Sequence, residues 1–205
     1  GSADGVLLNW GVAEPKWSAG KIGGALEFTT NDNAVVTAPA SVGAKWSVSF
    51  WVKMHARTSL NPRVIGPQDG RELWAYIDVE NSGGGAYLSH NQRTFEPAAL
   101  PLESWEHYVF TYDTDADIGT IYHDGVAVKS GSFHDNPTTQ AWVFGHNVDL
   151  GNHNDSLNGL IDDLRVYDRL LAPSEIFTLA GVPVAVADSY SISEDTPLTV
   201  PASSG

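Results

Sequence analysis

Residues 158–167, NGLIDDLRVY, decide the fold of this chain. Asn158-Gly159 is a turn dipeptide, and the residues after it alternate in the way a β-strand requires. Both faces of the predicted strand carry apolar residues, which is typical of a strand inside a layered sheet. The predicted faces are Leu160, Asp162, Leu164 and Val166 on one side, and Ile161, Asp163, Arg165 and Tyr167 on the other.

Asp162 is the unexpected residue in this strand, because it is predicted to share a face with Leu164 and Val166. An isolated buried charge is very costly, so a carboxylate there must accept hydrogen bonds or bind a cation. The sequence therefore predicts that the Asp162 carboxylate is bound either by hydrogen-bond donors or by a cation.

The composition excludes several classes of protein. A length of 205 residues suits one large β domain, or one domain plus a fragment. The net charge of −14 argues against nucleic acid or an anionic membrane surface as partner. The absence of cysteine excludes disulfides, cysteine-ligated zinc and a cysteine nucleophile. No apolar run is long enough to insert into a membrane, and Gly1-Ser2 is typical of a pair left by tag cleavage.

Short strand-like runs, separated by Gly, Asn, Asp and Pro, fill most of the chain. Asp124-Gly125 predicts a β-hairpin, and one short helix is predicted at residues 173–179. Many short strands with almost no helix indicate an all-β, two-sheet antiparallel sandwich. The runs are 25–28, 34–37, 46–54, 73–79, 86–90, 107–112, 120–123, 127–130, 142–145 and 160–167.

Several stretches resemble a known family, in that family's order. Residues 17–28, WSAGKIGGALEF, resemble the opening of the laminin-G-like, concanavalin A-like jelly rolls of bacterial modular proteins. The resemblance continues through 46–53, 105–113, 121–125, 158–169 and 171–176. It implies that residues 3–181 form a jelly roll of two antiparallel sheets, one of them with a concave face.

The C-terminal residues differ from the rest of the chain. Composition changes at residues 181–183, and residues 182–205 are too short to fold alone. They read as a linker and a first strand, and 185–205 resemble the start of a cadherin-like tandem repeat of large secreted bacterial proteins.

The family resemblance also implies a structural calcium ion that links an early loop to the late Gly-x-Ile-Asp strand. The matching residues are Asp32 and Asn33, with Asn31 beside them, and Asp162, with Asp163 beside it. Calcium prefers several oxygen ligands of these kinds. The alternative is that Asp162 caps backbone amides and the loop carboxylate is solvated.

Two other polar segments invite a metal interpretation. Residues 113–117 spell Asp-x-Asp-x-Asp but lack the glycine and distal glutamate of an EF-hand, so a solvated turn is favoured. The loop from His146 to Asp155 carries two histidines and two aspartates. Their spacing is loose for zinc, which favours a solvated loop beside a binding site.

A second candidate site is a platform for sugars, whose apolar faces pack on aromatic rings and whose hydroxyls take hydrogen bonds. Trp74, Tyr76 and Asp78 are predicted to share the face opposite an apolar one. The following strand is predicted to carry Tyr87, Ser89, Asn91 and Arg93 in alternation, of which Asn91 and Arg93 complete the platform. The alternative is that the two aromatic residues pack beneath a loop.

Catalysis is not expected. Glycoside hydrolysis needs two carboxylates at a defined separation. Asp78 and Glu80 match only the second half of the Glu-x-Asp-x-Glu strand of related hydrolases, because Tyr76 stands where the first glutamate would be. Arg71-Glu72-Leu73 matches one of three lyase strand motifs without the other two. No serine-hydrolase or zinc-protease motif is present.

These observations predict a monomeric, calcium-stabilised, non-catalytic carbohydrate-binding module of a large secreted or cell-surface bacterial protein. Its expected partner is a polysaccharide or glycan, and its role is to raise the effective concentration of a neighbouring domain near that polymer. The alternatives are a protein–protein adhesion or spacer module, and a divergent polysaccharide lyase or glycoside hydrolase.

Overall fold

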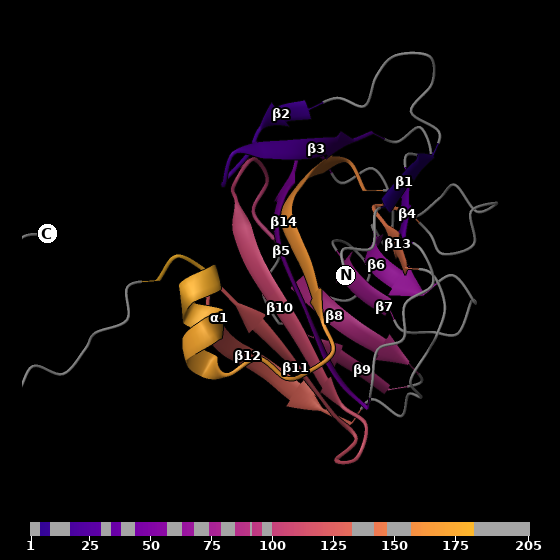
Figure 1. Ribbon diagram of the computed structural model, residues 1–205, viewed down its shortest axis with the longest axis vertical. Coiled ribbons are helices and arrows are strands. Elements are labelled where there is room, and N and C mark those ends of the chain that lie inside the picture. The colour runs from indigo at the N-terminus through magenta and orange to yellow at the C-terminus, as the bar shows by residue number, and fades with distance from the viewer. Residues whose placement is uncertain are drawn as a thin grey trace, which may run out of the picture.

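The computed structural model is an antiparallel sandwich of two seven-stranded sheets with one short helix (Figure 1). It describes residues 5–8, 17–29, 34–37, 44–56, 63–67, 74–78, 85–90, 92–95, 100–132, 142–146 and 157–182. Within these ranges no helix is long and apolar enough to cross a membrane. The predicted all-β jelly-roll class is confirmed.

Each sheet mixes strands from distant parts of the sequence, as crossovers in a jelly roll require. The first sheet has the order β1 (Gly5–Leu8), β4 (Ala34–Thr37), β13 (Trp142–Phe144), β6 (Arg63–Pro67), β7 (Trp74–Asp78), β8 (Gly85–His90) and β9 (Gln92–Phe95). The second has the order β12 (Val126–Gly131), β11 (Ile118–His123), β10 (Glu106–Asp113), β5 (Lys45–Met54), β14 (Gly159–Tyr167), β3 (Gly24–Phe28) and β2 (Trp17–Ala19).

The main core lies between the sheets and is built on β5 and β10. Phe50 pairs with Tyr108 in register, and the Phe50 ring stacks on Tyr108 and Phe110 at centroid distances of 6.2 and 5.8 Å. All three are fully buried. The predicted alternation of β5 is confirmed, since its apolar row belongs to this core: Trp46, Val48, Phe50, Val52 and Met54.

The predicted faces of β14 are wrong beyond Asp162. Asp162 pairs with Trp51, but Arg165 pairs with Ser49, so two residues of β14 oppose one residue of β5. Asp163 sits in this β-bulge with a φ of 46°. The bulge returns Leu164 to the core and places Asp162 on the outer face with Arg165. Asp162 therefore does not share a face with Leu164 and Val166.

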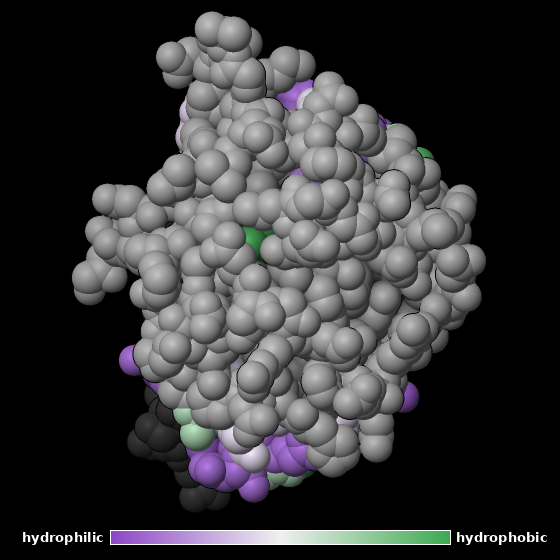
Figure 2. Space-filling view, turned by 90° about the vertical axis from the view of Figure 1, so that its right-hand side faces the viewer, coloured by the Kyte–Doolittle hydropathy of each residue, from purple (hydrophilic) through white to green (hydrophobic). Residues whose placement is uncertain are grey.

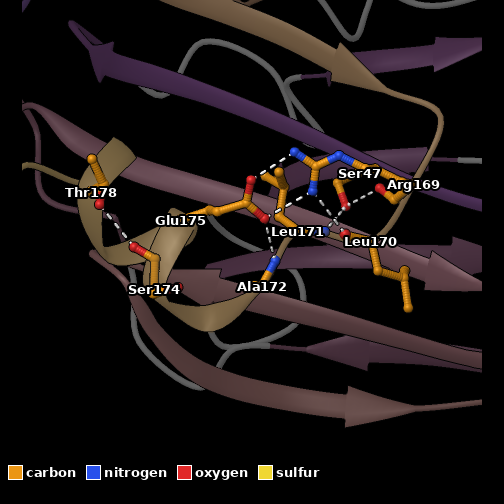
Figure 3. A network of polar contacts seen from close by, with 8 residues as sticks. All are labelled: Ser47, Arg169, Leu170, Leu171, Ala172, Ser174, Glu175 and Thr178. Atoms are coloured by element: carbon orange, nitrogen blue, oxygen red, sulfur yellow. Dashed lines mark hydrogen bonds and ion pairs between the residues drawn. The ribbon is translucent and has the colours of Figure 1, made fainter.

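The predicted helix is confirmed as α1 (Pro173–Leu179), which lies on the outer face of the second sheet (Figure 1). Ile176 and Leu171 form a small second core with Val109 of β10. A polar network fixes the segment before the helix (Figure 3). In it, Ser47 Oγ of β5 donates to the Arg169 carbonyl at 2.9 Å and accepts the Leu171 amide at 3.0 Å.

Glu175, in the first turn of α1, should make a contribution to folding stability that is lost in acid. The two hydrogen bonds from Arg169, helped by the Ala172 amide, lower the pKa of the Glu175 carboxyl from 4.5 to about 2. A carboxyl with a depressed pKa in the folded state stabilises it fully above the unfolded pKa, and that contribution is lost as the pH falls toward the folded one. Urea unfolding of wild type and Glu175→Gln should therefore differ most above pH 4.5 and converge toward pH 2. A difference that is the same at pH 6 and pH 3 would contradict this.

Gly145, directly after β13, lies where a larger residue should destabilise the fold. Its φ is 76°, and an added Cβ would overlap the buried Phe28 ring, whereas at Gly23, with a φ of 81°, an added Cβ meets nothing within 4 Å. Gly145→Ala should thus cost strain plus overpacking, about 2 kcal/mol or more beyond Gly23→Ala, which costs strain alone. The free energy of unfolding in urea measures both. Equal losses would show that Phe28 moves aside freely.

Candidate functional site

The register of the first sheet shows which of its faces is turned toward the core. Phe144 of β13 is buried in the core and pairs with Ile65 of β6, which pairs with Ala75 of β7. Ala75 in turn pairs with Leu88 of β8, and Leu88 with Thr94 of β9. Paired residues lie on the same face of an antiparallel sheet, so this row lies on the core side.

The neighbouring positions on these strands consequently lie on the outer face of the sheet. Trp74 pairs with Ser89, and Ser89 pairs with Arg93. A second row contains three aromatic residues and an arginine, namely Arg63, Tyr76, Tyr87 and Phe95. The β6–β7 register shifts between Arg63 and Ile65, which keeps Arg63 in the outer row although Val64 is buried in the core.

The structure thus brings Trp74, Tyr76 and Asp78 to one face of the sheet with Arg93, two strands away. Asn91, the remaining residue of the predicted platform, lies outside the described residues. The prediction of a single strand that carries Tyr87 through Arg93 is wrong, because β8 and β9 form a hairpin in which His90 pairs with Gln92. Phe95 and Arg63 were missed as members of this face, since only the observed pairing brings them to it.

Asp162 lies beneath the turn between β2 and β3, on the outer face of the second sheet. Asp162 is only 5% exposed. Oδ2 accepts the amide of Ile22 and Oδ1 accepts the amide of Asp163, each at 2.7 Å. The approach is so close that a Cβ on Gly20 would overlap the carboxylate. The Asp162 side chain therefore ties the β2–β3 turn to the bulge of β14.

These contacts bear on the predicted calcium ligands. Each carboxylate oxygen can accept more than one interaction, so the amides leave Asp162 able to bind a cation as well. Asp162 alone cannot complete a calcium site, which takes six to eight oxygens. Asp32 and Asn33, the other predicted ligands, and Asn31 lie outside the described residues. Asp163 is engaged elsewhere, since its Oδ1 accepts the Arg165 Nε at 2.9 Å.

A buried polar cluster beside Asp162 was not predicted from the sequence. Trp51 and His107 are buried on the outer face of the second sheet, with ring centroids 5.0 Å apart. His107 Nε2 lies 3.0 Å from Ser49 Oγ, and Lys21 Nζ lies 4.6 Å from the Trp51 ring. Burial lowers the pKa of His107 to about 4, so its imidazole is neutral at pH 7. The alternation of residues 47–53 places these residues on one face but does not show that the face is covered.

The turn at residues 113–117 is satisfied by the protein itself, as expected for a solvated turn. Asp113 Oδ1 accepts the amides of Asp115 and Ala116, and its other oxygen lies 3.0 Å from Lys45 Nζ. Tyr112 donates its hydroxyl to Asp117. Figure 2 shows hydrophilic surface at the lower end of the molecule, the end at which Figure 1 places the β10–β11 turn.

The second polar loop and the hydrolase half-motif are only partly described. His146 is fully buried, and the remaining residues of that loop, 147–155, lie outside the described ranges. Asp78 is the last residue of β7, and Glu80 lies outside the described residues.

Comparison with known proteins identifies the fold family. Residues 28–177, more than half of the chain, match the family model of the concanavalin A-like lectin/glucanases superfamily. No curated protein sequence matches the chain.

Solved structures of low sequence identity share the fold. Domain 4 of AbnA, a GH43 extracellular arabinanase from Geobacillus stearothermophilus solved with arabinotriose, is 22% identical with a TM-score of 0.65, over 82% of each chain. The binding domain of Paraclostridial Mosquitocidal Protein 1 is 14% identical with a TM-score of 0.64, over 87% of this chain and 47% of that one. A heptameric SAP-like pentraxin from Limulus polyphemus is 17% identical with a TM-score of 0.57, over 71% and 74%. On its fold and on the family match, the chain belongs to the concanavalin A-like lectin/glucanases superfamily.

Proposed function

We propose that this chain is a non-catalytic carbohydrate-binding module and that the outer face of β6–β9 is its glycan-binding surface. The observation that carries the proposal is the register of the first sheet. The row that continues from the buried Phe144 lies on the core side, so the positions of Trp74, Tyr76 and Arg93 lie on the opposite face.

The residue types on this face match the chemistry of a sugar. Aromatic rings pack against the apolar faces of pyranose and furanose rings, while arginine, aspartate and serine hydrogen-bond to hydroxyls. Trp74 and Arg93 are two strand spacings apart, about 10 Å, which suits contact with an oligosaccharide rather than a single hydroxyl. Two arginine positions, Arg63 and Arg93, also place positive charge on one face of a chain whose net charge is −14.

The relatives support a carbohydrate as the class of ligand. The family is named for lectins and glucanases, and one solved relative was crystallised with arabinotriose. Neutral arabino-oligosaccharides are consequently the first probes to use, followed by a wider array of plant and bacterial glycans.

The glycan proposal predicts that Trp74→Ala weakens binding at least about tenfold, as loss of an aromatic anchor worth about 1.4 kcal/mol or more requires. Isothermal titration with the glycan selected by the array measures this. Trp17→Ala is the matched control, because Trp17 is 67% exposed but belongs to β2 of the other sheet.

Four outcomes would contradict the proposed surface or the proposed function. If Trp74→Ala leaves glycan binding unchanged, the proposed platform is wrong. If Trp17→Ala abolishes binding, the site lies on the second sheet. Absence of binding across the array would favour a protein–protein adhesion or spacer module. New reducing ends or unsaturated products from a polysaccharide panel would favour a lyase or hydrolase instead.

We also propose that Asp162, Asp32 and Asn33 bind a structural calcium ion. Bound calcium would neutralise the carboxylates and join the loop before β4 to β14. The support is the ligand chemistry together with the burial of Asp162 at a junction between segments far apart in sequence.

The calcium proposal predicts that a chelator lowers the melting temperature of the wild type and that Asp162→Asn abolishes this sensitivity. Asp115→Asn is the control, since Asp115 is an exposed carboxylate of the β10–β11 turn. Thermal unfolding with and without chelator, with metal content verified, measures the effect. Unchanged melting of the metal-free wild type would leave Asp162 as an acceptor for backbone amides alone.

The setting of the module is proposed from the sequence. Residues 3–181 form the jelly-roll module, and residues 182–205 a linker that opens a cadherin-like repeat of a large extracellular bacterial protein. In that setting a monomeric module acts by holding its neighbours near a polysaccharide.

A further inference from the structure

Three metal-ligating side chains meet at one end of the β10–β11 hairpin, in the second sheet. Glu106 is the first residue of β10, His123 is the last of β11, and Asp124 begins the turn to β12. His123 Nε2 lies 2.8 Å from Glu106 Oε2 and 3.8 Å from Asp124 Oδ2. One ligand atom from each residue lies within 4.8 Å of the other two, and in the described part of the chain no other such group occurs.

The burial and charge of the cluster call for a cation. The side chains of Glu106 and His123 are 10% and 19% exposed, and Asp124 opens the cluster to solvent at 53%. Two carboxylates near one imidazole leave net negative charge unless a cation offsets it. Within the described residues neither carboxylate forms an ion pair with a lysine or an arginine.

The surrounding residues hold the ligands in place before any ion binds. The His123 ring stacks on the fully buried Tyr108 at a centroid distance of 4.4 Å, and its Nδ1 lies 3.5 Å from the Tyr108 hydroxyl. Asp124 Oδ1 accepts the His107 amide at 2.9 Å, which turns the other oxygen toward His123. Outer contacts of this kind fix the orientation and tautomer of metal ligands.

We propose that Glu106, His123 and Asp124 form a site for a divalent transition metal ion of the zinc type. Ligands about 2.1 Å from a tetrahedral zinc ion lie about 3.3 Å apart, and the two observed separations of 2.8 and 3.8 Å fall on either side of that value. The ion takes the place of the contact between His123 Nε2 and Glu106. With the ion on Nε2, the ring proton of the neutral imidazole is on Nδ1, which faces the Tyr108 hydroxyl. An imidazole ligand favours zinc, copper or nickel over calcium.

This site is distinct from the proposed glycan surface and from the proposed calcium ion at Asp162. An ion there would clamp the start of β10 to the turn after β11. That turn supports the helix, since a Cβ on Gly125 would press on the Phe177 ring of α1. Bound metal should therefore raise the melting temperature of the hairpin and helix together.

The test is titration of the chelator-treated, full-length chain with Zn²⁺ by calorimetry and with Co²⁺ by visible absorption. The expected result is saturable binding of one ion with a rise in melting temperature. Asp124→Asn should weaken binding at least tenfold. This variant keeps an Oδ1 acceptor for the His107 amide, so the fold should survive it. Glu106→Gln and His123→Asn should weaken binding further.

The matched control is His55→Asn. His55 also faces a carboxylate, with Nδ1 2.9 Å from Glu103 Oε1, but within the described residues this pair has no third ligand. The His55→Asn variant should leave the affinity for Zn²⁺ and Co²⁺ unchanged. The proposal is overturned if the wild type binds neither ion, if Asp124→Asn binds as tightly as the wild type, or if His55→Asn weakens binding as much as the cluster variants do.

Discussion

The bulge in β14 reconciles two opposing demands on one central strand. On the core side the strand must bury Ile161 and Leu164, which belong to or pack against the main hydrophobic cluster. On the outer side it must present Asp162 to the amides of the β2–β3 turn and Arg165 to Asp163. A strand with strict alternation cannot place both pairs correctly, because Ile161 and Leu164 would fall on opposite faces. The extra residue at Asp163 makes both sets of contacts compatible.

The same strand organises the rest of the second sheet. β14 lies between β5 and β3, and residues 168–172 connect its end to α1. Ser47 of β5 receives that segment through its hydroxyl, and Glu175 with Arg169 fixes the first turn of the helix. Part of the outer face of this sheet is therefore covered by the protein's own helix and by the β2–β3 turn.

Much of the second sheet could be predicted from the sequence, because its strands obey simple patterns. The alternation of β5 identified five core residues, and Asp124-Gly125 identified the β11–β12 hairpin. The bulge could not be predicted, since Asp163 adopts a positive φ without the glycine that usually signals one. The burial of His107 and Trp51 also escaped the sequence, because the turn that covers this region comes from residues far away in the chain.

The candidate glycan face was predictable only in part. Trp74, Tyr76 and Asp78 lie on one strand, so their common face followed from alternation alone. Tyr87 through Arg93 also alternate, and this pattern conceals the reversal between His90 and Gln92, because residues on both arms of a hairpin keep the same period. Phe95 and Arg63 join the face through pairing across strands, which no local pattern reveals. The proposed metal site also could not be predicted from a local pattern, since pairing across a hairpin brings Glu106 to His123.

The most direct test of the proposed glycan surface is a titration of ¹⁵N-labelled protein with an oligosaccharide that it binds, followed by amide chemical shifts. If the glycan binds the outer face of the first sheet, the largest changes should fall in β6–β9, within residues 63–67, 74–78, 85–90 and 92–95. Changes confined to the second sheet, around residues 17–29 or 106–124, would contradict it and show that the glycan binds on the opposite side of the sandwich.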